Sequence, residues 1–222
     1  MSIREEQKRQ SRQAIIDAAL RLSTSGRSFS TISLREISRE IGLVPTAFYR
    51  HFENIDALGL ELVDKVALHL KSILHQLGQA YLYQPEAKTR KSLELFFQAV
   101  DQNPEQWIFL ISERWGGSPT IRKAIARELE YLIEDFATDL QRIPSIQHIQ
   151  QHSDLKVLAQ ILISLACNWA MTWINFQENT NGTSLDQDKT LFQEQAITQV
   201  QLLFRGIIHW ESPSQPTAKK MS

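Results

Sequence analysis

Apolar side chains recur every three or four residues along most of the chain, the period of an amphipathic α-helix. The fullest example lies between residues 154 and 176, where one helix face carries Leu155, Leu158, Leu162, Leu165, Trp169 and Trp173. Glycine and proline are sparse, at 8 and 7 residues, and they fall between such segments, where helices begin or end. The pattern therefore predicts an all-α protein.

Capping residues divide the first part of the chain into three short or medium helices. The first is predicted over about residues 5–24. The second begins at Ser33, where Ser33 and Glu36 have the spacing of a capping box, and it closes at Gly42. The third starts at Pro45, because proline is tolerated in a first helical turn, although the preceding valine is a poor cap.

Six further helices bring the predicted total to nine. Asn54 caps a long fourth helix that reaches about Leu77, and a fifth lies between Glu86 and Asp101. The remaining starts are marked by the capping residues of Asn103-Pro104, Ser118-Pro119, Ser153-Asp154 and Ser184-Leu185-Asp186-Gln187. Residues 211–222 are rich in proline, serine and lysine and predict a disordered tail.

The segment 33–52 has the layout of a helix-turn-helix, two short helices joined by a three-residue connection that begins with glycine. Apolar residues form the packed faces, Leu34, Ile37 and Ile41 in the first helix and Phe48 and Phe52 in the second. The outward face of the second helix carries Thr46, Tyr49 and Arg50, which can contact phosphates or base edges.

Charge is distributed unevenly, although the whole chain has a net charge of only −1. Residues 1–52 contain nine Lys and Arg against five Asp and Glu, a net charge of +4, whereas the remainder carries −5. A basic N-terminal part suggests a polyanionic partner. The single cysteine, Cys167, lies in an apolar run, so the chain forms no disulfide framework and a reducing cytoplasm is the expected location.

The run from Ile41 to Phe52, Ile-Gly-Leu-Val-Pro-Thr-Ala-Phe-Tyr-Arg-His-Phe, strongly resembles the signature of the TetR family of repressors. The resemblance implies a DNA-binding domain over 1–52, a ligand-binding and dimerisation domain over 53–210, and a palindromic double-stranded DNA operator. It places phosphate contacts on Ser33, Tyr49 and His51, with Thr46 and Arg50 nearest the bases. The full expected DNA-binding set is Ser33, Arg35, Pro45, Thr46, Ala47, Tyr49, Arg50, His51, Arg4, Lys8 and Arg9.

One position departs from the family pattern. Most members have a lysine at the start of the fourth helix, where this chain has Ile55, so one usual phosphate contact is missing. Cations of the first helix can compensate on the flanking backbone or in the minor groove, namely Arg4, Lys8, Arg9 and Arg12. The alternative is that they form a solvated helix face.

The last two long helices of this family pair with their copies in a twofold dimer. Both helices have the required apolar stripes here, over 154–176 and over 187–210. A homodimer suits a helix-turn-helix that reads two half-sites one DNA turn apart. A purely internal core is the alternative interpretation of the same stripes.

Aromatic residues are concentrated in the middle of the chain, and there the sequence resembles one subgroup of the family. Segments from Asn103 to Gly117 and from Ile125 to Leu129 are similar to the repressors of unsaturated fatty acid synthesis, the FabR and DesT type, which sense long-chain acyl thioesters. The resemblance implies a small lipophilic effector, a long-chain acyl-CoA or acyl thioester, and control of genes for fatty acid unsaturation. The expected ligand-binding residues are Phe97, Trp107, Leu110, Ile111, Arg114, Trp115, Leu162, Leu165 and Trp169.

Two alternatives concern these same residues. Aromatic side chains at helical spacing are more often core than binding site. Arg114, Arg122 and Arg127 are placed to meet effector phosphates, yet Glu113, Glu128 and Glu130 are near enough in sequence to pair with them. Whether the effector strengthens or weakens DNA binding does not follow from the residues.

Other function classes find little support. His148 and His152 are four apart, but no acidic ligand follows at metal-site spacing, and no phosphate-binding loop or nucleophile motif appears, so we expect no enzyme, no metal and no cofactor. No apolar stretch is expected to reach the roughly 18–20 residues of a membrane span. A multidrug-sensing repressor of an efflux gene and a helical adaptor remain as alternatives.

Overall fold

The computed structural model describes residues 3–83, 88–179 and 183–211, and over this part of the chain it consists of helices without strands. The described residues form nine α-helices, which are α1 (Ile3–Thr24), α2 (Leu34–Glu40), α3 (Pro45–Phe48), α4 (Ile55–Tyr83), α5 (Lys88–Gln102), α6 (Pro104–Glu113), α7 (Pro119–Leu140), α8 (His152–Asn179) and α9 (Thr183–Ile207). Single 3₁₀ turns, η1 (Phe29–Thr31) and η2 (Pro144–Ile146), follow α1 and α7. The predicted all-α fold with nine helices is confirmed.

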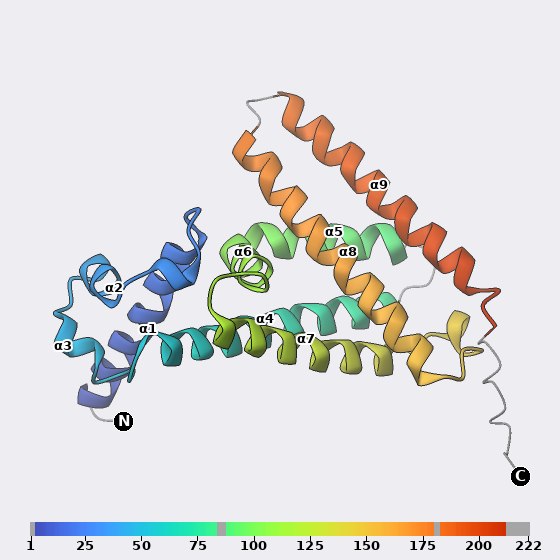
Figure 1. Cartoon of the computed structure of the whole chain (residues 1–222). Helices are drawn as coiled ribbons and strands as arrows, with labels where there is room; N and C mark the ends of the chain where they lie inside the picture. The colour runs from blue at the N-terminus through green and yellow to red at the C-terminus, as the bar shows by residue number, and fades with distance from the viewer. Residues whose placement is uncertain (1–2, 84–87, 180–182, 212–222) are drawn as a thin grey trace, which may run out of the picture.

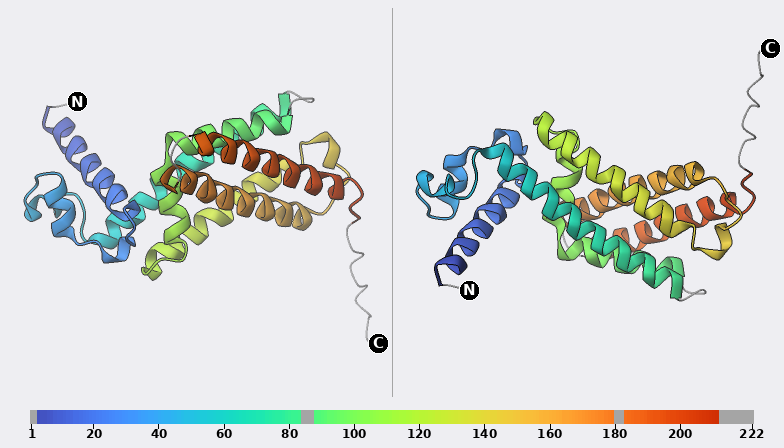
Figure 2. Two further views of the ribbon diagram at one scale, coloured as in Figure 1. Left: turned by 90° about the horizontal axis from the view of Figure 1, so that it is seen from above. Right: turned by 90° about the horizontal axis from the view of Figure 1, so that it is seen from below.

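The helices form a small head at one end of an elongated body (Figure 1). The head comprises α1–α3, and α4 leaves it to run along the body beside α7. On the other side of the body α8 and α9 lie side by side, and the views of Figure 2 agree on this pairing. α6 is a short helix that contacts α1 of the head and α8 of the body, so it lies at the junction between the two.

Several predicted caps are present at the expected atoms. Ser33 Oγ accepts the backbone N–H of Glu36 at 3.2 Å, and Glu36 Oε2 accepts the backbone N–H of Ser33 at 2.8 Å, which completes the capping box. Asn54 Oδ1 accepts the N–H of Ala57 at 2.8 Å. Ser118 Oγ caps α7 in the same way, with Ile121 N at 3.3 Å. These polar bonds are local, which is why sequence spacing identifies them.

Other predicted boundaries or caps differ from the structure. α1 begins at Ile3, and α4 continues past Leu77 to Tyr83. α8 and α9 begin at His152 and Thr183, so the serines predicted to cap them lie inside the helices. Asn103 makes no side-chain cap bond, and Pro104 begins α6 without one. Packing against neighbouring helices extends a helix beyond its local signals. Residues 86–87 of the predicted fifth helix and 212–222 of the predicted tail lie outside the described residues.

One cluster of buried apolar side chains joins the head to the body. It includes Ile15, Ile37 and Phe48 from the head and Leu58 and Leu62 from the first turns of α4, all at most 1% exposed. A second cluster lies where η2 packs between the end of α7 and the start of α8. Because α4 is buried against both parts, a domain boundary at residue 52 stays a prediction.

α8 overturns the expectation that no stretch is long and apolar enough for a membrane span. Over His152–Phe176 its mean hydropathy is 1.6, and 44% of the most apolar window is buried inside the molecule. Contacts with α5, α6, α7 and α9 give this composition a packing reason, because α8 packs against four helices of the body.

Candidate DNA-binding surface and effector pocket

The helix-turn-helix presents the predicted residues to solvent. Gly42 supplies the turn with a φ of +66°, a conformation that favours glycine, and Leu43 N–H bonds to Ser38 O at 2.8 Å. Phe48 is buried and packs on Phe52, with 5.6 Å between ring centroids. The outward side chains are exposed, and they are Pro45, Thr46, Tyr49 and Arg50. Ala47 is half-buried beside them.

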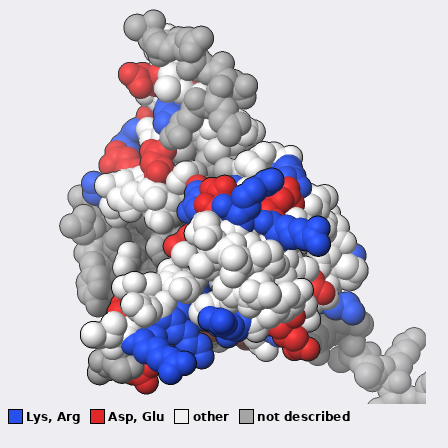
Figure 3. Space-filling model, turned by 90° about the vertical axis from the view of Figure 1, so that its left-hand side faces the viewer, with Lys and Arg blue, Asp and Glu red and all other residues white. Residues whose placement is uncertain are grey.

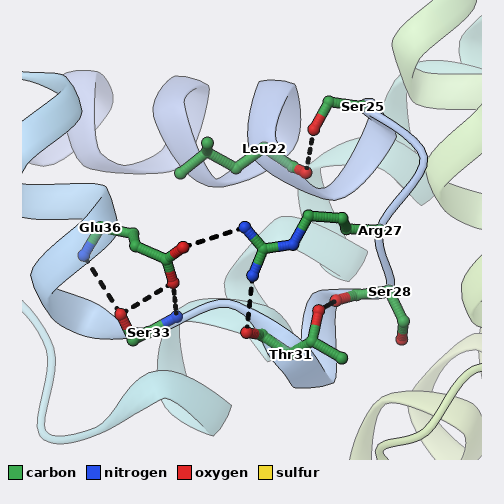
Figure 4. A network of polar contacts seen from close by, with 7 residues as sticks. All are labelled: Leu22, Ser25, Arg27, Ser28, Thr31, Ser33 and Glu36. Atoms are coloured by element: carbon green, nitrogen blue, oxygen red, sulfur yellow. Dashed lines mark hydrogen bonds and ion pairs between the residues drawn. The ribbon is translucent and has the colours of Figure 1, made fainter.

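A polar network fixes the start of α2 against the turn that follows α1 (Figure 4). The Arg27 guanidinium donates to Glu36 Oε1 at 2.9 Å and to the Thr31 carbonyl at 3.0 Å. The bond from Arg27, with the bonds from Ser33, lowers the pKa of Glu36 to about 2. The Ser33 hydroxyl already donates to Glu36 at 2.8 Å, so a contact with phosphate through this hydroxyl requires an exchange of partners.

His51 lies half-buried behind the outward face of the recognition segment. Its Nδ1 atom is buried and has no hydrogen-bond partner among the described residues. Burial, and then the positive charges of Arg12, Lys8 and Arg50, lower the pKa of His51. The lowered pKa favours the neutral imidazole at pH 7, which can offer DNA a hydrogen bond but no positive charge.

The cations of α1 are not equivalent. Arg12 donates to both carboxylate oxygens of Glu61 and to the His51 carbonyl, and its guanidinium lies 4.2 Å from the centroid of the Phe52 ring. It therefore connects α1, α4 and the end of the helix-turn-helix and is neither a solvated residue nor a free cation. Arg9 pairs with Glu6 at 2.9 Å. Arg4 and Lys8 are exposed.

Basic side chains gather on the head end of the molecule (Figure 3). The view shows two areas, one mostly basic and one in which acidic side chains lie among the basic ones. Ion pairs of the head account for such mixing, since Arg21 lies 3.8 Å from Glu40 and Arg27 lies 2.9 Å from Glu36. Arg35, on α2, is exposed.

A pocket of about 200 Å³ lies between α6, α7 and α8. It contains four of the nine residues expected to bind the effector, Leu110, Ile111, Arg114 and Trp115. Its other lining residues are Leu129, Cys167, Asn168 and Met171. Trp115 is 79% exposed at the rim, and the Arg114 guanidinium lies 5.4 Å from the centroid of its ring. We name this hollow the Arg114 pocket.

The other five expected residues lie elsewhere. Phe97, Trp107 and Trp169 belong to a packed aromatic cluster in which Phe96 lies 5.5 Å from Trp107 and 6.2 Å from Trp169, between ring centroids. Phe97 stacks on Trp173 at 4.3 Å. Leu165 packs against the main core cluster and Leu162 against the second one. These rings and side chains are packed into the core clusters, and none of the five lines the Arg114 pocket.

Two of the three arginines proposed for effector phosphates already have partners in the protein. Arg122 donates to the Gly116 and Gly117 carbonyls at 2.6 and 3.2 Å. Arg127 pairs with Glu128 at 3.1 Å. Arg114 makes no salt bridge with a described residue. Burial raises the pKa of the Cys167 thiol, and the positive charge of Arg114 acts in the opposite direction with a smaller effect.

Sequence reasoning missed the role of Glu113, the last residue of α6. Its carboxylate is buried, accepts the backbone N–H of Phe29 at 2.7 Å and lies 3.3 Å from the Ser28 hydroxyl. The following glycines make room for this contact, because a Cβ atom at Gly116 would lie 2.2 Å from Glu113 Oε2. A Cβ atom at Gly117 would lie equally close to Ser30 Oγ. The glycine pair was the only local signal.

The two histidines considered for a metal site do not converge. His148 Nε2 lies 3.0 Å from the Ile207 carbonyl, whereas His152 Nε2 lies 2.5 Å from Glu134 on α7. Within the described ranges, no group of three or more His, Cys, Asp or Glu side chains is arranged to hold a metal ion.

Apolar side chains are exposed along the outer faces of α8 and α9. Val157 and Ile161 are 56% and 41% exposed on α8. Leu191 and Leu202 are 60% and 65% exposed on α9. Their helical spacing leaves a surface with unburied apolar area on the two helices predicted to dimerise.

Two family descriptions match the sequence. Residues 15–62 match "Bacterial regulatory proteins, tetR family", and residues 85–206 match "Tetracyclin repressor-like, C-terminal domain". Neither description is of an enzyme family. The two matched ranges cover the helix-turn-helix with the start of α4 and most of the body.

Three solved structures of the same fold illustrate the range of structural similarity. A putative transcriptional regulator from Pseudomonas aeruginosa PAO1 has a TM-score of 0.65 and 17% identity, with 90% of this chain and 91% of that chain covered. The fatty acid degradation regulator FadR from Bacillus halodurans has a TM-score of 0.60 and 14% identity, with 89% and 94% covered. FadR from Bacillus subtilis, solved with stearoyl-CoA, has a TM-score of 0.57 and 14% identity, with 90% and 99% covered. At these identities the likeness shows the fold. With the two family matches, the chain belongs to the TetR family of DNA-binding transcriptional regulators.

Proposed function

We propose that this regulator, a repressor, binds a palindromic operator as a homodimer and that a long-chain acyl thioester controls its affinity. The regulated genes would be those of fatty acid synthesis and unsaturation. The observation that carries the proposal is the Arg114 pocket, in which a guanidinium that has no carboxylate partner among the described residues lies beside Leu110, Ile111 and Leu129. An acyl thioester has the matching parts, an apolar chain and the phosphate of its carrier.

The chemistry of the pocket suits such a ligand. Leu110, Ile111 and Leu129 offer apolar contact to methylene groups. Arginine binds phosphate through paired N–H donors, and a cation near a low-dielectric surface attracts an anion more strongly than one in open water. Trp115, exposed at the rim, adds a face on which a carrier group can stack.

The exposed face of the recognition segment supports the DNA contact. Thr46, Tyr49 and Arg50 point outward while Phe48 anchors the segment in the core. Arg4 and Lys8 extend the positive surface along α1. Arg9 pairs with Glu6, so it adds to this surface when its guanidinium contacts a DNA phosphate as well as that carboxylate. We assign DNA binding to residues 1–52, and effector binding and dimerisation to residues 53–210.

The outer faces of α8 and α9 are the proposed dimer surface. A twofold axis along these faces would bury Val157, Ile161, Leu191 and Leu202 against their copies. Two heads would then face one side of a duplex, as required for reading two half-sites about 34–36 Å apart.

FadR from Bacillus subtilis, solved with stearoyl-CoA, shows that a chain of this fold accommodates a long-chain acyl thioester. The identity of 14% carries no residue over to this protein. The Arg114 pocket, found in this chain itself, is therefore the stronger support.

A multidrug-sensing repressor of an efflux gene is the second candidate, because Glu113, the neighbour of Arg114 in the sequence, is a buried carboxylate and Trp115 is an exposed ring. Lipophilic cations bind to such groups. Both Glu113 oxygens already have partners in Phe29 and Ser28, however, and Arg114 repels a cation at the rim. The geometry therefore favours an anionic ligand.

The test is fluorescence anisotropy with a duplex covering the gene's own upstream region and a desaturase promoter, with palmitoyl-CoA and oleoyl-CoA added separately. We expect salt-sensitive binding that at least one acyl-CoA changes, and we expect Arg114→Ala to lose this response while DNA binding is retained. Arg142→Ala, a matched change beyond the end of α7, should respond as the wild type does. DNA binding that ignores both acyl-CoAs but responds to lipophilic cations would favour the multidrug alternative.

A helical adaptor would behave differently in the same assay. Replacing Thr46 and Tyr49 by alanine should abolish operator binding while the protein stays a folded dimer. An adaptor would show no operator binding from the start, so that the double variant would change nothing.

A further inference from the structure

A second, larger hollow lies at the junction between head and body. Its volume is about 500 Å³. The head side is formed by the end of α1 and the turn after it, residues 23–28, and the body side includes Ile108, Met171 and Ile174. Glu113 also lines it, so the hollow adjoins the contact that ties α6 to Phe29. We name it the junction hollow.

The two hollows are neighbours, because both have lining residues on α6 and α8 and they share Met171. On α8, Cys167 lines the Arg114 pocket, Ile174 lines the junction hollow, and Met171 lines both. These three residues are four and three positions apart, so they follow one another on a single helix face. On α6 the lining residues interleave, because Ile108 and Ser112 line the junction hollow and Ile111 lines the Arg114 pocket, so the two hollows lie on neighbouring sides of this helix.

A long-chain acyl thioester is too large for the Arg114 pocket alone. Sites for drug-sized ligands usually have volumes of about 300–1,000 Å³. The Arg114 pocket, at about 200 Å³, is below this range, whereas the junction hollow, at about 500 Å³, lies within it. A long acyl chain whose carrier is held at Arg114 therefore needs the space on the far side of Met171.

We propose that the acyl chain of the effector passes Met171 and ends in the junction hollow, so that Met171 is a chain-length gate and residues 23–28 sense the chain. The inference rests on the proposed function and extends it to a site that none of the expected ligand-binding residues occupies. Methionine suits a gate, because its three rotatable bonds let an unbranched side chain move aside at low cost.

The lining of the hollow is partly polar, since it also includes Arg27, Ser112 and Asn175. The hydroxyl groups of residues 23–25, however, do not oppose an apolar chain. Ser23 and Ser25 donate to the carbonyls of Leu20 and Leu22 at 2.8 and 2.9 Å. Thr24 donates to Leu20 O at 3.1 Å. Because these donors are satisfied within α1, removing water from them leaves no unmade hydrogen bond, and the cost of burying them is reduced.

A ligand that fills the junction hollow would act at the contact that holds the head to the body. The chain end would lie beside Glu113 and Ser28, whose contact fixes the turn between α1 and α2. A ligand shifts an equilibrium only through different affinities for two states, and a chain that prefers one separation of head and body supplies that difference. A chain too short to pass Met171 binds at Arg114 and leaves DNA affinity unchanged.

The first experiment compares butyryl-CoA, octanoyl-CoA and palmitoyl-CoA with wild-type protein, Met171→Leu and Met171→Trp. Only the longest chain should change operator affinity in the wild type, by about 5-fold or more. Met171→Leu, similar in volume, should respond alike, whereas Met171→Trp should bind butyryl-CoA and lose the response to palmitoyl-CoA. A full response in Met171→Trp, or an equal response to all three chains, would overturn the gate.

The second experiment fills the hollow without relying on the effector. Ser112 is an exposed residue that lines the junction hollow, so Ser112→Cys in a Cys167→Ala background accepts an alkyl chain from decyl methanethiosulfonate as a mixed disulfide. Ser72→Cys, exposed on α4, is the matched control. The decyl group at 112 should shift operator affinity, and the same group at 72 should not.

The two experiments test the proposed effector and the role of the junction hollow separately. A shift with the tethered chain but no effect of any acyl-CoA would overturn the proposed effector and keep the junction hollow as the controlling site. An acyl-CoA response without any shift from the tethered chain would overturn the role of the junction hollow and keep the proposed function.

Discussion

Glu113 and Phe29 are 84 positions apart in the sequence, yet Oε1 of the buried carboxylate accepts the backbone N–H of Phe29 at 2.7 Å. The bond joins the end of α6 to the turn between α1 and α2. The Phe29 side chain is also buried, and its ring packs edge-on against Phe109 of α6, with 6.2 Å between centroids. The head is therefore held to the body at both the backbone and the side chain of one residue.

Removing the carboxylate should destabilise the protein. Glu113→Ala leaves the N–H of Phe29 buried without an acceptor, which costs about 1–3 kcal/mol. Glu113→Gln retains an oxygen in the same place and should cost less. The free energy of unfolding from urea titration checks the order, and an equal loss in both variants would show that the acceptor oxygen is not what matters.

Gly59 on α4 is a second place where close packing joins the two parts. A Cβ atom there would lie 2.4 Å from Ile121 Cδ1 and 2.7 Å from Phe29 Cε1. Gly59→Ala should therefore lower stability by about 1–3 kcal/mol through overpacking, despite the better helix propensity of alanine. Thermal unfolding tests this, and Phe29→Leu in the same chain should recover part of the loss. A more stable Gly59→Ala protein would show that these side chains move aside freely.

The sequence predicts the head better than the site that controls it. The capping box of Ser33 and Glu36 and the outward position of Tyr49 depend on spacings of three or four residues, which periodicity shows directly. The Glu113 bond and the junction hollow depend on contacts between residues more than 80 positions apart, for which local patterns carry no signal.

Aromatic residues show the same limit in the body. The pattern around Phe97, Trp107 and Trp169 fits the wall of an effector site and a packed core equally well, because both require large apolar side chains at helical spacing. Packing decides between them, since Phe96 and Trp173 fill the space between these rings. Leu110 and Arg114 lie at the pocket because α6 ends against α8 there, which depends on tertiary structure.

Acid should weaken the contact between Arg27 and Glu36. The folded protein lowers the pKa of Glu36 from 4.5 to about 2, so the unfolded chain binds the proton more readily. The stabilisation is complete above about pH 4.5 and is lost as pH falls from there toward 2. Glu36→Gln should be less stable than the wild type at neutral pH and lose less on acidification.

Arg27→Met should have a similar effect, because the bond from Arg27 is the largest cause of the lowered pKa of Glu36. Unfolding free energies measured from pH 7 to pH 2.5 provide the comparison. An acid-induced loss in Glu36→Gln as large as that of the wild type would assign the loss to other carboxylates.

The salt dependence of operator binding should separate Arg50 from His51. Arg50 is exposed and charged, so if it contacts a phosphate, Arg50→Ala should lower the slope of log K against log salt by about one unit per half-site. Burial and nearby cations lower the pKa of His51, so His51→Gln should weaken binding at pH 7.5 without changing the slope. A slope change in His51→Gln would show that the imidazole is charged in the complex.

The outer face of α9 offers a sharp test of the proposed dimer. Leu202 is 65% exposed on that face, and Leu68 is 71% exposed on α4. Replacing either leucine therefore removes little contact within its own chain. Leu202→Asp would place a charge in the apolar centre of a twofold interface and should convert the dimer to a monomer. Leu68→Asp makes the same change away from that face and should leave the dimer intact. Light scattering coupled to size-exclusion chromatography measures both masses. If both variants stayed dimeric with unchanged affinity, the partner surface would have to lie elsewhere, and the spacing of the two recognition segments would have to be set by different helices.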